Sequence, residues 1–222
     1  MHVWRVEAPH ADATLLSPAE RARAGSYASG SRARAFVATR TALRRILGAY
    51  LDTAPAAVPL EAERHHKPHV DALDPLRRVS FNLAHRLDRM LIAVAREVEV
   101  GVDVELGRSP HEVRAVERTV LSEAERASVE ALGAEERHAA VVRQWVRREA
   151  VIKATGEGLR IPPATIDVGA PEVRSARRLV DAGGASWRLW DLTPWQDATG
   201  AVAAEPTVTS VRCLEWTAAP TG

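Results

Sequence analysis

Cysteine and long apolar runs are both scarce in this chain of 222 residues, and each shortage excludes a class of protein. The single cysteine, Cys213, has no partner for an internal disulfide, which favours a reducing, cytoplasmic location. No uncharged apolar run approaches the roughly 18 residues that a membrane-spanning helix needs. The first residues are charged without an apolar stretch behind them, so we expect neither a signal peptide nor a membrane partner.

An excess of charge of one sign is also missing, because the formal net charge is only +1. This balance excludes a strongly basic nucleic-acid module and an acidic disordered tail, so no nucleic-acid partner is expected. Hydrophobic residues make up 46% of the chain, which is enough for the core of one large domain or two small ones. A self-contained pair of small units needs no second copy, so we expect a monomer.

Lysine is nearly absent as well, since Lys67 and Lys153 are the two lysines among 30 basic residues and the other 28 are arginines. A chain that uses arginine by default keeps lysine where a compact ammonium is useful, for example at a phosphate. Chance retention is the alternative. Residues 1–50 hold eight arginines against three acids, so this region forms either a solvated basic helix face or one wall of an anion site.

A run from Ala134 to Thr155 without glycine or proline predicts a long helix that ends at Gly156. Residues four apart share a helix face, so Trp145, Glu149 and Lys153 lie on one ridge of it. A carboxylate and an ammonium on such a ridge are either a plain surface ion pair or part of a site.

Apolar periodicity and capping signals predict the other elements. Strands are expected at 2–7, 79–85, 89–96, 98–105, 165–168, 186–192 and 208–216. Helices are expected from the N-cap Ser17, over 31–51, over 110–121 and from Ser122. The short turn at 97–99 predicts that the strands on either side of it are antiparallel neighbours.

The order of these elements is strand, helices, strands, repeated once, and the two repeats meet near residues 97–101. The chain is therefore predicted to be an α/β (α+β) protein with two similar halves, 1–98 and 99–222. Each half is expected to hold a small, mainly antiparallel sheet with packed helices.

Asp103 and Glu105 stand two apart on a predicted strand, so both carboxylates point to one face of it. That face is either the polar solvent side of a half-buried sheet or one side of a cation site. Two carboxylates with a third from a distant helix, such as Glu149, are ligands that octahedral Mg²⁺ selects. The histidines at 65, 66 and 69 lack the spacing of a metal site, and a loop or strand edge that presents Lys67 is the preferred interpretation.

Three motifs follow one another along the chain. They are 81–85 (Phe-Asn-Leu-Ala-His), 101–105 (Gly-Val-Asp-Val-Glu) and 145–159, which reads Trp-x-x-[Lys/Arg]-Glu-x-x-x-Lys followed by Gly-x-Gly-Leu. In this combination the chain resembles a 4′-phosphopantetheinyl transferase of the surfactin-synthetase-activating (Sfp) type. His66-Lys67-Pro68 is similar to the Gly-Lys-Pro element of that family, and the resemblance covers about residues 17–167.

Four departures from the family pattern concern affinity and substrate detail. The family usually has Ser where Ala84 stands, Ser-Gly where Arg86-Leu87 stand, Gly where His66 stands and Lys where Arg148 stands. Loss of the serine hydroxyl removes one phosphate contact, and the loop after His85 must differ.

The resemblance implies a pseudo-twofold protein with coenzyme A in the cleft between its halves. It also implies the reaction, in which the phosphopantetheine arm of coenzyme A moves to a serine of an apo acyl or peptidyl carrier protein. Adenosine 3′,5′-bisphosphate is released.

The same resemblance implies roles for individual residues. Mg²⁺ is expected on Asp103, Glu105 and Glu149, and Lys153 is expected to reach the same phosphates. His85 would donate to a phosphate oxygen. Lys67 would meet the nucleotide end of coenzyme A, joined by Arg34 and Arg40.

The carrier serine needs a base, and Glu149 is expected to serve directly or through a metal-bound water. Glu125 is expected to pair with Arg148, whereas Trp145 is expected to pack and fix the helix. Two other classes remain open. A non-catalytic homologue would bind coenzyme A or a carrier without transfer, and a metal-dependent phosphodiesterase or nuclease would turn over without a carrier serine.

Overall fold

The structure is a computed structural model, and it describes residues 1–7, 9–61, 69–70, 78–171, 173 and 177–217. Lys67, for which a contact to the nucleotide is predicted, lies outside the described residues. The neighbouring His65 and His66 lie outside them as well.

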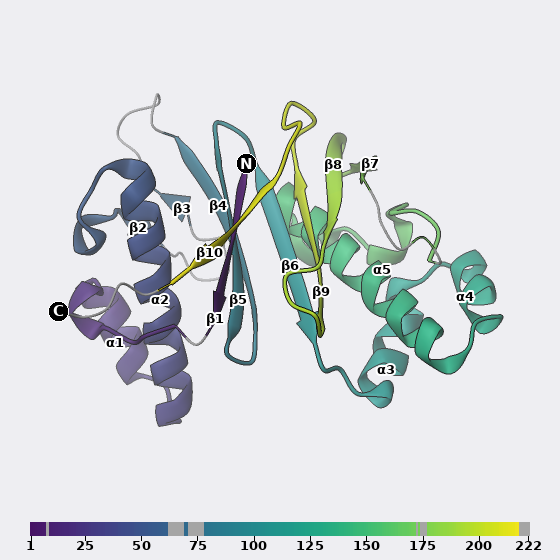
Figure 1. Cartoon of the computed structure of the whole chain (residues 1–222), viewed down its shortest axis with the longest axis horizontal. Helices are drawn as coiled ribbons and strands as arrows, with labels where there is room; N and C mark the ends of the chain where they lie inside the picture. Colours follow the sequence, from purple (N-terminus) through teal and green to yellow (C-terminus); the bar gives the residue numbers. More distant parts are fainter. Residues whose placement is uncertain (8, 62–68, 71–77, 172, 174–176, 218–222) are drawn as a thin grey trace.

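Two four-stranded sheets stand side by side at the centre of the molecule (Figure 1). The first has the order β10-β1-β5-β4 and consists of β1 (His2–Glu7), β4 (Val79–Arg86), β5 (Arg89–Arg96) and β10 (Arg212–Trp216). The second has the order β6-β9-β8-β7 and consists of β6 (Val100–Leu106), β7 (Arg177–Ala182), β8 (Ala185–Leu192) and β9 (Ala198–Ala204). The short strands β2 (Leu60–Glu61) and β3 (His69–Val70) pair with each other. All neighbours are antiparallel except β1 and β10, which run parallel.

Helices flank the two sheets on their outer sides (Figure 1). The helices α1 (Pro18–Gly25) and α2 (Gly30–Leu51) flank the first sheet, and α3 (Pro110–Val120), α4 (Glu123–Glu130) and α5 (Ala134–Thr155) flank the second. Short 3₁₀ turns occur at Ala13–Leu15, Pro55–Ala57, Gly158–Arg160 and Pro163–Thr165. The mixed α+β class is confirmed. Among the described residues, no helix is both long and apolar enough to cross a bilayer.

Local sequence signals explain where the helices begin and end. The side chains of Ser17 and Ser122 each accept a hydrogen bond from the backbone N–H of the third residue of the helix that follows. That residue is a glutamate, and its carboxylate accepts a hydrogen bond from the backbone N–H of the serine. At the other end, α5 stops where Gly156 adopts a left-handed φ of 74°. The predicted bounds of α5 are confirmed, and those of α2 differ by one residue.

The hydrophobic core has a central layer where the two sheets meet. Val102 and Val104 of β6 belong to this layer, together with Leu91 of the first sheet and Val202 of the second. Separate apolar clusters lie under α2 and under α5. Strand β6 is buried throughout, because its valines and Leu106 belong to the central layer and Asp103 and Glu105 face α5.

The two halves join at their facing edge strands, β4 and β6. The buried Oδ1 of Asn82 on β4 accepts a hydrogen bond from the Val102 backbone N–H at 3.0 Å. The predicted pairing of 89–96 with 98–105 is therefore wrong, since β5 pairs with β1 and β4 whereas β6 pairs with β9. Glu97 adopts a left-handed φ of 62° in the connection, and the chain crosses to the second sheet instead of folding back.

Three further strand predictions need correction. Residues 165–168 form no strand, because a 3₁₀ turn covers Pro163–Thr165. The apolar side chains of Ile166 and Val168, which suggested a strand, are buried in the cluster under α5. The last strand begins at Arg212 instead of 208, and β7 and β9 had not been predicted. Because β10 belongs to the first sheet, residues 212–216 pack with the N-terminal half, and the division at 98/99 stays a prediction.

Strand β6 and helix α5 approach each other closely at Gly101. A Cβ built on Gly101 would lie 2.1 Å from the carbonyl oxygen of Ala150 and 2.3 Å from the backbone nitrogen of Ala154. Any larger residue must push the helix away from the strand. The glycine of the Gly-Val-Asp-Val-Glu motif thus sets the distance between Asp103 and the ridge that carries Lys153.

We expect Gly101→Ala to lower the free energy of unfolding by about 3 kcal/mol, because the added methyl overlaps helix backbone that cannot rotate away. Urea denaturation measures the change. Gly25→Ala is the matched control, since a Cβ there meets nothing within 4 Å. It should be neutral or stabilising by up to about 1 kcal/mol. Equal stability of the two variants would contradict the prediction.

Candidate active site

The acidic face of β6 lies buried against the ridge of α5. The side chains of Asp103 and Glu105 are 10% and 8% exposed, so the alternative of a solvated sheet face is wrong. Trp145 of the ridge contacts Glu105, and Lys153 contacts Asp103. Strand β6 and the ridge of α5 therefore meet through these four side chains.

Asp103 is a buried acid that Lys153 contacts directly. Its Oδ1 accepts a hydrogen bond from Lys153 Nζ at 2.7 Å, and the same ammonium donates to the Val102 carbonyl at 3.2 Å. Its Oδ2 is buried and has no hydrogen-bond partner among the residues that the structure describes. Burial raises the pKa of Asp103 to about 6, Lys153 opposes that rise, and the charges of Glu149 and Glu105 add to it.

Glu105 is held mainly through one carboxylate oxygen. Its Oε1 accepts hydrogen bonds from Trp145 Nε1, at 3.2 Å, and from the guanidinium of Arg108. Its buried Oε2 has no hydrogen-bond partner, although Arg86 Nε stands 3.6 Å away. Two neighbouring acids therefore each present one unpaired, buried oxygen.

Glu149 is half-buried on the ridge between Trp145 and Lys153. Burial raises its pKa, and the cation of Lys153 opposes that rise. The charge of Glu105 raises the pKa further, whereas Arg108 lowers it. These mutual influences show that Glu149 is an electrostatic neighbour of the acids on β6.

The donor chemistry of this cluster fits a hard divalent cation. Buried carboxylate oxygens without partners are costly unless a cation satisfies them. Within the described part of the chain, no three His, Cys, Asp or Glu side chains are arranged as a ready metal cage. Mg²⁺ does not require one, since it is commonly held by one or two carboxylates together with substrate phosphates. The ligand set Asp103, Glu105 and Glu149 stays a prediction.

Arg148, the residue before Glu149, points away from the acids. Its Nη2 donates to both oxygens of Glu125 at 2.8 Å, which confirms the predicted pair. Its Nε donates to the Pro163 carbonyl at 2.8 Å, and Gln144 accepts a further bond. Arg148 therefore anchors α5 to α4 and to the following turn.

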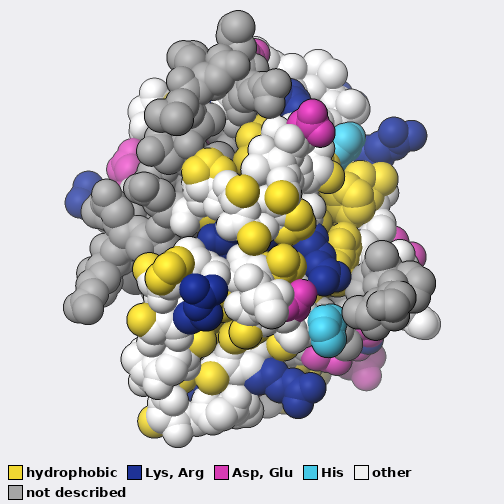
Figure 2. Space-filling model, turned by 90° about the vertical axis from the view of Figure 1, so that its left-hand side faces the viewer, with side chains coloured by type: hydrophobic (Ala, Val, Ile, Leu, Met, Phe, Trp, Pro, Cys, Tyr) yellow, Lys and Arg dark blue, Asp and Glu magenta, His cyan; other side chains and the backbone are white. Residues whose placement is uncertain are grey.

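A cleft of about 510 Å³ lies on the other side of the seam, between the first two helices and β4. It is lined by Arg23, Tyr27, Arg32, Ala35, Phe36, Thr39, Arg40, Asn82, Leu83 and His85. The guanidinium groups of Arg23 and Arg40 lie 5.4 and 5.3 Å from the ring centre of Phe36. Figure 2 shows the side of the molecule that carries these helices, where basic side chains gather among hydrophobic ones.

Two of the residues predicted to bind coenzyme A, Arg40 and His85, line this cleft. Arg34 is exposed on α2 and is not among the lining residues, because it lies on a different side of the helix from Arg32. Arg23 and Arg32 had not been singled out. The basic character of residues 1–50 was the signal for them, but helical phase alone did not identify which arginines face the cleft.

Arg40 is the deepest of the cleft cations. Its Nε stands 3.5 Å from Glu20 Oε1, and its buried Nη1 has no hydrogen-bond partner. Burial lowers its pKa, while the charge of Glu20 raises it. An unpaired N–H of a buried guanidinium is a donor that suits an anionic ligand.

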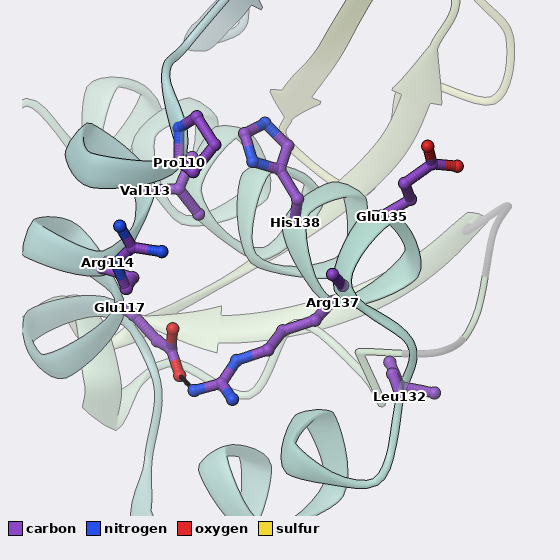
Figure 3. Close-up of a pocket in the computed structure, with 9 residues that line it drawn as sticks. Pro110, Val113, Arg114, Glu117, Leu132, Glu135, Arg137 and His138 are labelled. Atoms are coloured by element: carbon purple, nitrogen blue, oxygen red, sulfur yellow. Dashed lines mark hydrogen bonds and ion pairs between the residues drawn. The ribbon is translucent and has the colours of Figure 1, made fainter.

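A larger cavity of about 610 Å³ lies between α3 and the start of α5 (Figure 3). In this view Glu117 points toward Arg137, and their ion pair closes one side at 2.6 Å. Neither the acids of β6 nor the ridge of α5 line it. Cavity size therefore does not identify the site, and the unpaired carboxylates do.

In the metal-free protein, the free energy of unfolding is expected to fall as the pH rises from about 4 to about 6. The pKa of Asp103 is raised from 3.8 to about 6, so in this window the folded state holds a proton that the unfolded state has lost. The fall is about 3 kcal/mol, at about 1.4 kcal/mol per pKa unit. Urea denaturation at several pH values measures it, and Asp103→Asn should flatten the profile. Identical profiles for both proteins would contradict the assignment.

Comparison with known proteins agrees with this geometry. Residues 99–204 match the model of the 4′-phosphopantetheinyl transferase superfamily. The chain is 28% identical to the 4′-phosphopantetheinyl transferase HetI of Nostoc sp., over 91% of this chain and 86% of HetI. A putative 4′-phosphopantetheinyl transferase of Synechocystis sp. is 33% identical over 65% of this chain and 58% of its own length.

The 4′-phosphopantetheinyl transferase AcpT of Salmonella typhimurium is 38% identical over 40% of this chain and 45% of AcpT. The superfamily match begins just before β6 and ends with β9. It thus contains the acidic face, the ridge of α5 and the sheet that supports both. This region of the chain is similar to the 4′-phosphopantetheinyl transferase superfamily.

Proposed function

We propose that the protein transfers the 4′-phosphopantetheine arm of coenzyme A to a serine of an apo carrier protein, with release of adenosine 3′,5′-bisphosphate. One observation carries this proposal. Two buried carboxylates on β6 contact Lys153 and Trp145, each has one oxygen unpaired among the described residues, and the adjoining strand β4 lines a basic cleft. A site of this kind suits a substrate that has a pyrophosphate at one end and a phosphorylated nucleoside at the other.

The cleft on α1, α2 and β4 is the proposed site of the nucleotide end. Arg23, Arg32 and Arg40 supply positive charge for its phosphate, and the rings of Tyr27 and Phe36 supply apolar surface for the base. His85 closes the cleft on β4, the strand that meets β6. This placement directs the pyrophosphate toward the acids on the other side of the seam.

Asp103, Glu105 and Glu149 would hold the Mg²⁺ ion, with its remaining positions open to phosphate and water. When bound, the ion neutralises charge that develops on the pyrophosphate as the bond breaks. Lys153 would add a second fixed positive charge from the same ridge. Its present bond to Asp103 keeps the ammonium at the site in a defined position.

Glu149 is the proposed base for the carrier serine. Its pKa is raised by burial, which makes the carboxylate a better proton acceptor than an exposed glutamate. As Glu149 accepts the hydroxyl proton, the serine oxygen bonds to the phosphorus of the pantetheine arm. The pyrophosphate bond breaks, and its bridging oxygen leaves with adenosine 3′,5′-bisphosphate. The fixed cations stabilise the charge that appears on that oxygen.

The identity of the carrier, the Sfp-type subclass and the preference for Mg²⁺ belong to this proposal. The monomeric state and the cytoplasmic location stay predictions. Retention of the three acids and Lys153 favours an active transferase over a binding homologue without activity. A phosphodiesterase would release product without any carrier, which the first assay below distinguishes.

We expect Glu149→Gln to reduce carrier modification by at least about 100-fold while the fold is kept. The assay incubates the protein with coenzyme A, Mg²⁺ and several apo carriers, and measures the carrier's mass gain. Lys153→Ala should also lose most activity, because it removes a cation at the phosphates. The control is Glu135→Gln, which changes an exposed glutamate in the first turn of the same helix and should leave activity unchanged. Full activity of Glu149→Gln would contradict the role of Glu149 in both metal binding and catalysis.

We expect Arg32→Ala to raise the KM for coenzyme A by about fivefold, with little change in kcat, because it removes a cation that faces the nucleotide. Arg34→Ala is its matched control, since Arg34 is exposed two residues further along the same helix and does not line the cleft. An equal effect of the two variants on KM would show that long-range charge, and not the cleft, binds the nucleotide.

A further inference from the structure

Arg108 holds a place at the acids that the transfer reaction, as described above, does not use. It follows β6 by two residues and donates to Oε1 of Glu105. Its guanidinium lies 5.6 Å from the ring centre of Trp145, and its side chain is only 18% exposed. Its Nε is buried and has no hydrogen-bond partner in the described part of the chain. Arg108 is thus a positioned cation with a donor that the described residues leave unused.

Cations already offset part of the negative charge of the cluster. Asp103, Glu105 and Glu149 carry three formal negative charges. Lys153 and Arg108 each bond one of these acids, and Arg86 stands near Glu105 while it also contacts Glu112. A divalent cation placed among these acids would add two positive charges beside Lys153 and Arg108. Electrostatics therefore favours its entry together with an anion of similar charge.

The pyrophosphate of coenzyme A supplies such an anion, with about two negative charges. Resting on the proposed function, we infer that Arg108 exchanges partners at this site: it leaves Glu105 to the divalent cation and donates to a pyrophosphate oxygen. Arg108 is then a further substrate-binding residue, and in the free enzyme it competes with the metal for Glu105.

Trp145 provides the support for this exchange. The indole ring packs with the apolar clusters under α5, and its N–H donates to Glu105. A guanidinium stacked on a fixed ring stays beside the site when its carboxylate partner is taken, because the attraction to the ring face remains. The planar fork of arginine also matches two oxygens of a phosphate, which an ammonium does not.

The test compares metal binding and coenzyme A binding in the same variants. Mn²⁺ is titrated into metal-free, full-length protein, and free Mn²⁺ is followed by electron paramagnetic resonance with no coenzyme A present. Arg108→Ala is expected to bind Mn²⁺ about tenfold more tightly than the unmodified chain, because the competing cation is gone. The same variant is expected to bind coenzyme A about tenfold more weakly in the presence of Mg²⁺, by calorimetry.

Opposite changes in one variant separate this exchange from simple structural damage, which would weaken both ligands. Arg118→Ala is the matched control, because Arg118 is exposed on α3. It should change neither affinity. Arg108→Lys keeps the charge but loses the planar fork, so its Mn²⁺ affinity should stay near that of the unmodified chain while coenzyme A binds more weakly. If Arg108→Ala does not fold, Arg108→Gln makes the same comparison.

Unchanged or weaker Mn²⁺ binding in Arg108→Ala overturns the inference, and so does unchanged coenzyme A binding. The carrier-modification assay on the unmodified chain separates this failure from failure of the proposed function. If the unmodified chain modifies carriers but Arg108→Ala does not bind Mn²⁺ more tightly, the proposed function is supported and the partner exchange of Arg108 is overturned. If Arg108→Ala shows both affinity changes but the unmodified chain modifies no carrier, the exchange is supported and the proposed function is overturned.

Discussion

The contact between the backbone of β6 and the backbone of α5 at Gly101 is the constraint on which the site depends. Because no side chain separates strand from helix there, the next residues on that face, Asp103 and Glu105, meet the ridge of α5 within bonding distance. The apolar face of β6 is fixed at the same time by the layer between the sheets. A strand buried on both faces thus places two carboxylates where water solvates them poorly. Neighbouring cations and hydrogen-bond donors must therefore stabilise their charge.

Arginine forks stabilise the structure around this site. Arg44, Arg147 and Arg148 are almost fully buried, and each bonds both a carboxylate and backbone carbonyls. A planar group with five donors can satisfy several acceptors at once, which a lysine in the same place could not do. Lys153, the single described lysine, has a different use at the proposed site, because a flexible ammonium can exchange its partner when a substrate binds.

The sequence predicted the elements whose signals are local. Periodicity predicts helix α5 and the shared face of Asp103 and Glu105, and a local capping signal predicts the capping box at Ser17. The structure has all three. Its errors concern long-range partners. Nothing local distinguishes a strand that turns back from β6, which crosses to another sheet. Strand β9 was missed because four of its seven residues are alanine, a residue that is depleted in strands. Arg23 and Arg32 were missed because the cleft they line exists only after α1 and α2 have packed on β4.

The parallel pairing of β10 with β1 has a consequence for how the chain reaches its fold. Strand β1 lies between β5 and β10, so its second neighbour comes from residues 212–216 at the far end of the chain. During synthesis β1 lacks this second neighbour until residues 212–216 have left the ribosome. The pairing of β1 with β10 is a contact of very high sequence separation, and contacts of this kind slow folding.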